Sequence, residues 1–240
     1  MKLLALETST ERLSVGVLRN GETWLHEGVG GAQASAALIP AIEGLMARAE
    51  LTYGQLDAIV FGRGPGSFTG LRTACAVAQG LAYGARVPVL PVDTLLAVAE
   101  EARLSQADPA ETLQVLALID ARMNEVYGAR YRREARDASD WTALDACALM
   151  SPQQVAAQSG DLLAGNVFEV YREQLSGVAN ARCAAWPTAR ALLSLAPGLW
   201  AAGHAVDAAQ ALPLYIRDKV AQTTQEREAA RAALTTGKTP

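Results

Sequence analysis

The sequence predicts an α/β fold in which the second half of the chain repeats the pattern of the first in a reduced form. A short apolar run at residues 2–6 indicates a buried strand. The Asn20-Gly21 pair is the strongest signal for a β-hairpin turn, because both positions accept positive φ. Apolar residues then recur at helical spacing between residues 34 and 50. A second apolar run at residues 113–119 restarts the pattern.

The first half is expected to have the element order βββαβαβα. Alternating apolar residues at 12–18 and the return at 22–29 complete a three-strand meander with the first strand. In the helix that follows, Leu38, Ile42 and Leu45 form the core stripe, and Pro40 predicts a kink or a start near Ser35. The remaining elements are a strand at 58–62, a helix ending at Tyr83, a strand at 87–92 and a helix at 94–102.

The second half is expected to begin after a linker at Asp108-Pro109. Its predicted elements are strands at 113–119, 125–131 and 141–149, and helices from Pro152, from Val167 and over 187–199. We therefore expect an N-terminal subdomain at 1–106, a reduced C-terminal subdomain at 107–222, and a flexible, Ala-rich and Thr-rich tail at 223–240.

Composition is that of an ordinary globular protein: 50% of the 240 residues are hydrophobic and 19% are charged. A formal net charge of −4 argues against binding nucleic acid through overall charge, and the one dense basic cluster is Arg130, Arg132, Arg133 and Arg136. The three cysteines, Cys75, Cys147 and Cys183, are widely spaced among small apolar residues, which predicts core residues rather than disulfides. With no signal-peptide or membrane-spanning pattern, we expect a cytoplasmic protein.

Two polar motifs could bind an anion. Glu7, Thr8 and Ser9 follow the first strand, where a phosphate loop or a hydrogen-bonded Ser/Thr turn would both fit. The glycine-rich stretch after residue 62 is followed by a helix and is either an anion site or a rigid turn with Ser67 or Thr69 as the N-cap. Its residues of interest are Gly64, Gly66, Ser67, Thr69 and Gly70.

A metal centre is not expected in this chain. The two histidines, His26 and His204, lie far apart in the sequence, and the first helix has no pair of metal ligands at i and i+4. With only these two histidines, no Ser–His–Asp triad can be assembled with confidence from the sequence.

The first two helices carry an unusual number of small residues, which predicts either ordinary packing on a sheet or a flat docking surface for another helix pair. The candidate interface residues are Ala34, Ala37, Leu38, Ala41 and Leu45 from the first helix, and Leu71, Arg72, Cys75 and Ala78 from the second. Substituting Arg for Ala41 or Ala78 is expected to weaken assembly and leave the monomer folded.

Several blocks resemble one family in both order and spacing. They include Gly64-Pro-Gly-Ser-Phe-Thr-Gly-Leu-Arg72, Asp120-Ala-Arg-Met-Asn-Glu-Val-Tyr127 and Leu214-Tyr-Ile-Arg217. By these blocks the chain is identified as a member of the TsaB (YeaZ) family, the dimerisation subunits of the bacterial complex that makes N6-threonylcarbamoyladenosine (t6A) in tRNA.

The resemblance implies an actin-like (ASKHA) fold of two RNase H-like subdomains. It implies a non-catalytic scaffold that binds the catalytic paralogue TsaD and, with it, the ATPase TsaE, and that contacts tRNA indirectly. ATP and a divalent metal are expected on the partner subunits, and no cofactor is expected on this chain alone. When the partner is absent, the chain is expected to form a homodimer. TsaD has a His-x-x-x-His metal motif on the helix matching Ala34 to Leu38; here Ala34 precedes Ser35, and Glu7 replaces a usual Asp. The competing functions are a small actin-fold kinase or ATPase, and a glycoprotease-like peptidase.

Two further expectations concern structure. Gly66 should be needed for a backbone conformation that only glycine adopts easily, so that Gly66→Val impairs folding or binding. Asp120, Arg122 and Glu125 should form a hydrogen-bond or ion-pair network that joins the two subdomains, a functional surface being the alternative.

Overall fold

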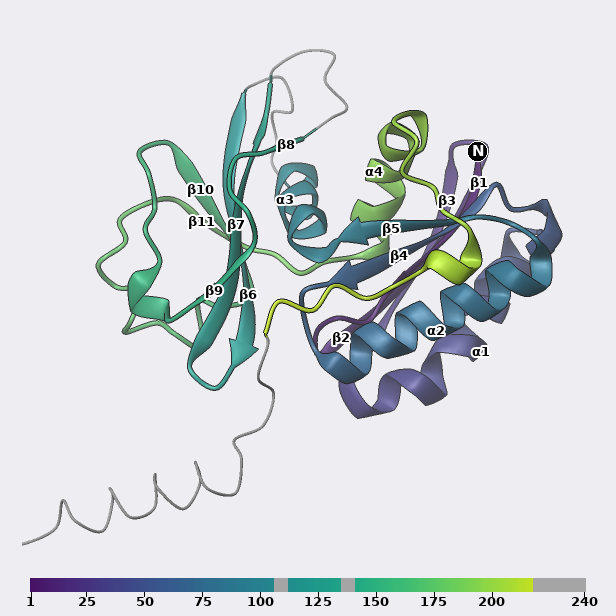
Figure 1. Ribbon diagram of the computed structural model, residues 1–240, viewed down its shortest axis with the longest axis horizontal. Coiled ribbons are helices and arrows are strands. Elements are labelled where there is room, and N and C mark those ends of the chain that lie inside the picture. Colours follow the sequence, from purple (N-terminus) through teal and green to yellow (C-terminus); the bar gives the residue numbers. More distant parts are fainter. Residues whose placement is uncertain (106–111, 135–140, 218–240) are drawn as a thin grey trace, which may run out of the picture.

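The computed structural model describes residues 1–105, 112–134 and 141–217 (Figure 1). The expected linker at Asp108-Pro109 and the tail at 223–240 lie outside these ranges. The described residues form two β-sheets with helices packed on and between them.

The first sheet has the strand order β3-β2-β1-β4-β5. Its antiparallel part is the predicted meander, and Asn20 and Gly21, with φ of 51° and 94°, form the turn that pairs Arg19 with Glu22. Strands β4 and β5 run parallel to β1. The strands are β1 (Lys2–Glu7), β2 (Arg12–Arg19), β3 (Glu22–Val29), β4 (Ala58–Gly64) and β5 (Val89–Asp93).

Helices cover both faces of the first sheet, because successive side chains of a strand point to opposite faces. On one face Leu4 and Leu6 pack under α1 (Ala34–Arg48) and α2 (Phe68–Ala85), which lie side by side (Figure 1). On the other, Leu3 and Ala5 pack against α4 (Ala189–Ala201), next to α3 (Thr94–Leu104). α1 begins at Ala34, close to the predicted start at Ser35, and Pro40 lies inside the helix. Single 3-10 turns occur at Gly31–Gln33, Tyr53–Gln55, Pro152–Gln154 and Ala208–Gln210.

The second sheet repeats the topology of the first. Its order is β11-β10-β6-β7-β8, with β9 also paired to β7, so that three antiparallel segments are again followed by two parallel strands. Two sheets of this one topology are the two RNase H-like units of an actin-like fold, which confirms the expected fold class. The strands are β6 (Leu113–Arg122), β7 (Glu125–Arg133), β8 (Thr142–Ala143), β9 (Ala148–Met150), β10 (Asp161–Gly165) and β11 (Arg182–Ala184).

Several predicted elements of the second half are wrong. Residues 141–149 contain two short strands rather than one, and β10 and β11 were not predicted. The predicted helices from Pro152 and Val167 do not form: the first is a single 3-10 turn and residues 168–177 are turns. Val167, Tyr171 and Leu175 are buried at helical spacing, but β-branched and aromatic residues are weak helix formers, and these turns close without a continuous helical ladder.

The two sheets share packing elements. Leu95, Val98 and Ala102 of α3 pack against β6 and β7 of the second sheet, so α3 lies between the sheets (Figure 1). After the second sheet the chain returns to the first through α4, and Val206 pairs with Val89 of β5. The final described segment, residues 211–217, then crosses to the second sheet and is called the strap below (Figure 1). In the described part of the chain, no helix combines the length and the apolar character needed to cross a membrane.

Candidate functional site: the cleft between the sheets and the exposed face of two helices

The loop after β1 and the glycine turn before α2 pack against each other. Thr8 Oγ1 donates to the carbonyl of Gly70 over 2.7 Å, and the Ser67 N–H donates to the carbonyl of Ser9 over 2.8 Å. A Cβ on Gly70 would stand 1.8 Å from the Thr8 carbonyl oxygen, and one on Gly66 would stand 2.5 Å from that of Ser9. The two predicted motifs are therefore one interlocked unit that seats the start of α2.

The expected reason for glycine at position 66 needs correction. The residue of this turn with positive φ is Gly64, at 119°, whereas Gly66 is required because the Ser9 backbone passes too close for a side chain. Ser67 is the N-cap of α2, as predicted, although its hydroxyl accepts the Gly70 N–H only at 3.5 Å. Thr69 is exposed in the first turn of the helix.

Glu7 is turned into the protein interior. Its side chain is 1% exposed, Oε1 accepts the Ser9 N–H over 2.6 Å, and Oε2 is buried without a hydrogen-bond partner. The carboxyl group fits because Gly62 has no side chain; a Cβ there would stand 1.8 Å from Oε2. Burial, opposed by hydrogen bonds from Ser9, raises the pKa of Glu7 from 4.5 to about 7.

Glu7→Gln is expected to make the stability of the protein less dependent on pH. Because the folded-state pKa of Glu7 lies above its unfolded value, its protonation stabilises the fold below pH 4.5, and this contribution is lost as the pH rises toward 7. Over that range the wild type should lose about 3 kcal/mol that the variant does not lose. Urea denaturation at pH 5 and pH 8 measures the difference, with the exposed Glu22→Gln as control. Equal pH slopes in wild type and Glu7→Gln would contradict the account.

A cleft of about 320 Å³ lies between the two sheets. It joins the β1 loop and the start of α2 to the β6–β7 hairpin of the second sheet. Its lining residues are Ser9, Thr10, Glu11, Gly31, Gly66, Ser67, Phe68, Asp120, Ala121, Arg122, Met123, Tyr127, Asn166 and Arg217. Glu7 is not one of them, although it comes two residues before Ser9.

The predicted network of Asp120, Arg122 and Glu125 is only partly present at the hairpin: Asp120 and Arg122 interact, and Glu125 has another partner. Asp120 accepts the Tyr171 hydroxyl over 2.7 Å and forms an ion pair with Arg122 at 3.2 Å. Glu125 instead pairs with Arg217 of the strap at 2.5 Å. One connection to the first sheet comes from a neighbour of Asp120 rather than from the three residues: Asn166 accepts the Asp120 N–H over 2.9 Å and donates to Glu11 over 3.5 Å.

The strap is held at its middle and at its end. On the first sheet the Leu214 N–H donates to the carbonyl of Arg63 over 2.6 Å, and the Tyr215 ring stacks on Phe68 with centroids 4.8 Å apart. Arg72 of α2 donates to the Tyr215 hydroxyl over 3.0 Å. At its end, Arg217 donates to the carbonyl of Ala121 over 3.0 Å. The hairpin tip that it holds, residues 122–124, has three consecutive non-glycine residues with positive φ.

The predicted interface is only partly available on the surface. Six of its nine residues are buried against the first sheet, because they form the side of each helix that faces the strands: Ala34, Leu38, Leu45, Leu71, Cys75 and Ala78. Ala37 and Ala41 are half-buried, and Arg72 is exposed. Arg at position 78 would thus disrupt the core rather than test a docking surface, which corrects that prediction.

The exposed side of the two helices is the helix face, defined here as Ala36, Pro40, Gly44 and Ala47 of α1 with Ala76, Gly80, Tyr83 and Gly84 of α2. Gly44 and Gly80 lie inside the helices and Gly84 lies in the last turn of α2, and a Cβ added at any of them would meet nothing within 4 Å. The Tyr83 side chain is 80% exposed.

The basic cluster predicted from the sequence is divided in the structure, because Arg130 is buried whereas Arg132 is exposed. Arg130 is 6% exposed, and its guanidinium pairs with Asp161 at 3.1 Å and with Asp145. Arg132 pairs with Glu134 at 2.7 Å, and Arg136 lies outside the described residues. Within this cluster Arg130 therefore holds neighbouring segments of the second sheet together.

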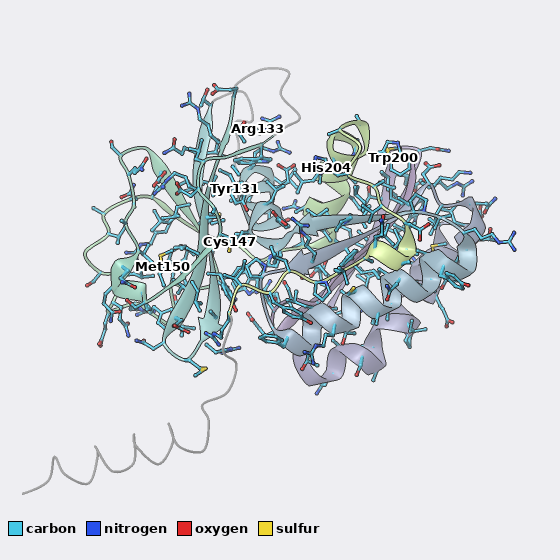
Figure 2. All side chains as sticks on the ribbon, in the orientation of Figure 1. Tyr131, Arg133, Cys147, Met150, Trp200 and His204 are labelled. Carbon is cyan, nitrogen blue, oxygen red and sulfur yellow. The ribbon has the colours of Figure 1, made fainter. Side chains whose placement is uncertain are left out.

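The two histidines and the three cysteines differ in burial. Both histidines are exposed, and His204 lies in the loop after α4, near Trp200 (Figure 2). Among residues 1–105, 112–134 and 141–217, no three His, Cys, Asp or Glu side chains are placed to hold a metal ion. Cys75 is a core residue as predicted, whereas Cys147 and Cys183 are half-buried. Burial raises the pKa of Cys147 to about 12, so its thiol stays protonated at neutral pH.

Two RNase H-like sheets with a cleft between them define a protein of the actin-like class. Comparison with known proteins identifies the family within this class. Residues 28–233 match the family described as TsaD, tRNA N6-adenosine threonylcarbamoyltransferase. A Haemophilus influenzae protein named tRNA threonylcarbamoyladenosine biosynthesis protein TsaB is 36% identical over 230 residues, covering 92% of this chain and 95% of that protein. The Escherichia coli protein of the same name is 31% identical over 229 residues, covering 92% of this chain and 96% of that protein.

A solved structure agrees with these relatives. YeaZ from Pseudomonas aeruginosa superposes with a TM-score of 0.80 at 38% identity, covering 89% of this chain and 99% of that one. The chain belongs to the TsaB family. This membership places it among the proteins of t6A synthesis.

Proposed function

We propose that this chain is a non-catalytic scaffold in the synthesis of t6A at position 37 of tRNAs that read codons starting with A. It binds a TsaD-type catalytic subunit through the helix face and, with that subunit, a TsaE-type ATPase. Contact with tRNA is indirect. The chain alone holds no cofactor, ATP and a divalent metal being bound by the partners, and without its partner it forms a homodimer. The complex acts in the cytoplasm.

The observation that carries the proposal is the set of exposed glycines in α1 and α2. Glycine inside a helix costs about 1 kcal/mol relative to alanine. Gly44, Gly80 and Gly84 face open space, so packing within the chain does not require them. Glycines that destabilise their own helix are explained by a second backbone that approaches the helix face more closely than a Cβ would allow.

The similarity to the TsaD family supports the identity of that second backbone. Because residues 28–233 match the TsaD family, a TsaD-type subunit is expected to have helices equivalent to α1 and α2. Two related folds can then meet through equivalent helix pairs in a pseudo-symmetric contact. The same geometry allows two copies of this chain to pair when the partner is absent.

The cleft supports a non-catalytic role. An actin-type phosphate site needs an acidic residue directed at the bound phosphates, but the carboxyl group of Glu7 is buried against Gly62 and does not line the cleft. No contact in the described structure favours a kinase, an ATPase or a peptidase over the scaffold.

Gly80→Ala is expected to have opposite effects on the monomer and on the assembly. Alanine should raise the free energy of unfolding by up to about 1 kcal/mol, because the helix gains propensity and the new methyl meets no neighbour. The same methyl should weaken binding to the TsaD-type subunit by about tenfold, a loss of about 1.4 kcal/mol. Denaturation of the free chain and calorimetric titration of the partner measure the two effects.

The control for Gly80→Ala is Ser35→Ala, which raises helix propensity at an exposed position of α1 outside the helix face. It should leave binding unchanged. If the wild-type chain does not bind the TsaD-type subunit at all, the proposed function is wrong. If Gly80→Ala binds as tightly as the wild type, the helix face is not the contact.

A further inference from the structure

We infer that the strap is a second part of the partner-binding surface, contributing Leu212 and Tyr215 to the contact that begins on the helix face. This inference rests on the proposed function, because the occupant is the same TsaD-type subunit. Two properties of the strap carry it: the exposure of its apolar side chains and its fixed position beside α2.

The helix face has a small footprint for an interface. α1 has 15 residues and α2 has 18. At 1.5 Å per residue and a width of about 10 Å each, the two helices have a flat footprint of about 500 Å². A specific, stable complex buries about 800 Å² on each partner. A partner that also contacts a surface adjoining these helices would bury more area and gain further anchors.

The strap adjoins α2 directly. Besides the Tyr215–Phe68 stack, two hydrogen bonds tie it to the helix: the Arg72 guanidinium donates to the Tyr215 hydroxyl over 3.0 Å, and the Cys75 thiol donates to the carbonyl of Ala211 over 3.4 Å. The strap thus continues the surface of α2 on the side away from α1, toward the second sheet (Figure 1).

The strap leaves large apolar side chains in water. Leu212 is 68% exposed and Tyr215 is 43% exposed, although the backbone of the segment packs on the protein. Met123, which contacts Arg217 at the end of the strap, is 64% exposed. Exposed apolar side chains beside a proposed contact surface are suitable anchors for a protein partner.

The strap is also preorganised. Its backbone is fixed at the middle by the Leu214 N–H and the Tyr215–Phe68 stack. The ion pair of Arg217 with Glu125 fixes its end. A partner that binds a segment already held in place does not have to order it, which lowers the entropic cost of association. An extended segment held in this way can act as a contact surface although it has no regular secondary structure.

The test is calorimetric titration of the full chain with the TsaD-type subunit of the same organism. Leu212→Ser should weaken binding about tenfold or more, and Tyr215→Ser at least as much, because both truncate apolar anchors. Val170→Ser removes a side chain that is 56% exposed and lies outside both the strap and the helix face, and it should leave binding unchanged. Thermal denaturation and hydrogen exchange of the Leu214 amide verify that each variant keeps the strap in place.

The outcomes separate this inference from the proposed function. If Gly80→Ala weakens binding and Leu212→Ser and Tyr215→Ser do not, the strap is not a contact and the scaffold proposal stands. If the strap variants weaken only the homodimer, measured by light scattering, the occupant is a second copy of the chain and the inference is wrong. If the wild type binds no TsaD-type subunit, the proposed function itself fails. If the strap variants weaken binding while Gly80→Ala does not, the strap is no extension of the helix face.

Discussion

Arg130→Met is expected to destabilise the protein by about 3–5 kcal/mol, because it leaves the buried carboxylate of Asp161 without its cationic partner. Arg130 also donates to Asp145 and, over 2.9 Å, to the carbonyl of Ala156. Its removal therefore loosens strand β7 from the start of β10 and from the segment before it. Urea or guanidinium denaturation at pH 7 measures the loss.

Arg132→Met is the matched control for Arg130→Met. The side chain of Arg132 is 47% exposed and that of its partner Glu134 is 60% exposed, so this ion pair is screened by water. Its loss should cost about 0.5 kcal/mol or less. If the two variants are destabilised equally, the buried ion pair is not what holds the second sheet.

Gly44→Arg is expected to abolish assembly and leave the monomer folded. A Cβ at Gly44 meets open space, so the free chain accommodates the new side chain, and replacing glycine removes a helix-weakening residue. A bulky cation in the middle of the helix face should lower the affinity for the TsaD-type subunit by about 100-fold or more, equivalent to about 2.7 kcal/mol. Light scattering of the free variant should show a monomer.

The control for Gly44→Arg is Arg at an exposed position outside the helix face, and Val170→Arg supplies it. This variant should bind the partner and itself as the wild type does. If Gly44→Arg remains dimeric when free but loses the TsaD-type subunit, the two assemblies use different surfaces, and a shared helix face is ruled out.

Much of the first sheet could be predicted from the sequence because its signals are local. Asn20-Gly21 fixes a hairpin turn, and runs such as Leu3 to Leu6 are buried on both faces of the sheet. The second sheet was harder to predict. Strands β10 and β11 have five and three residues, and a short apolar run such as residues 162–164 is compatible with strand or helix alike.

The candidate site shows what residue patterns cannot decide alone. Leu38, Cys75 and Ala78 were placed on an interface because they lie among small residues, but small residues occur on both sides of α1 and α2. Which side faces the sheet depends on the packing of the helix against strands distant in the sequence. The same holds for Arg130, whose partner Asp161 lies 31 residues away. The informative signal on α2 was the Gly80-Leu-Ala-Tyr-Gly84 spacing on its solvent side.

The scaffold proposal is tested most directly by t6A formation on a tRNA that reads codons starting with A, using the purified TsaD-type and TsaE-type subunits of the same organism. We predict that product forms when the wild-type chain is present, that omitting the chain or replacing it with Gly44→Arg abolishes product, and that the chain alone neither modifies tRNA nor hydrolyses ATP. Undiminished t6A formation without this chain, or ATP hydrolysis by the chain alone at rates typical of enzymes, would contradict the proposed function.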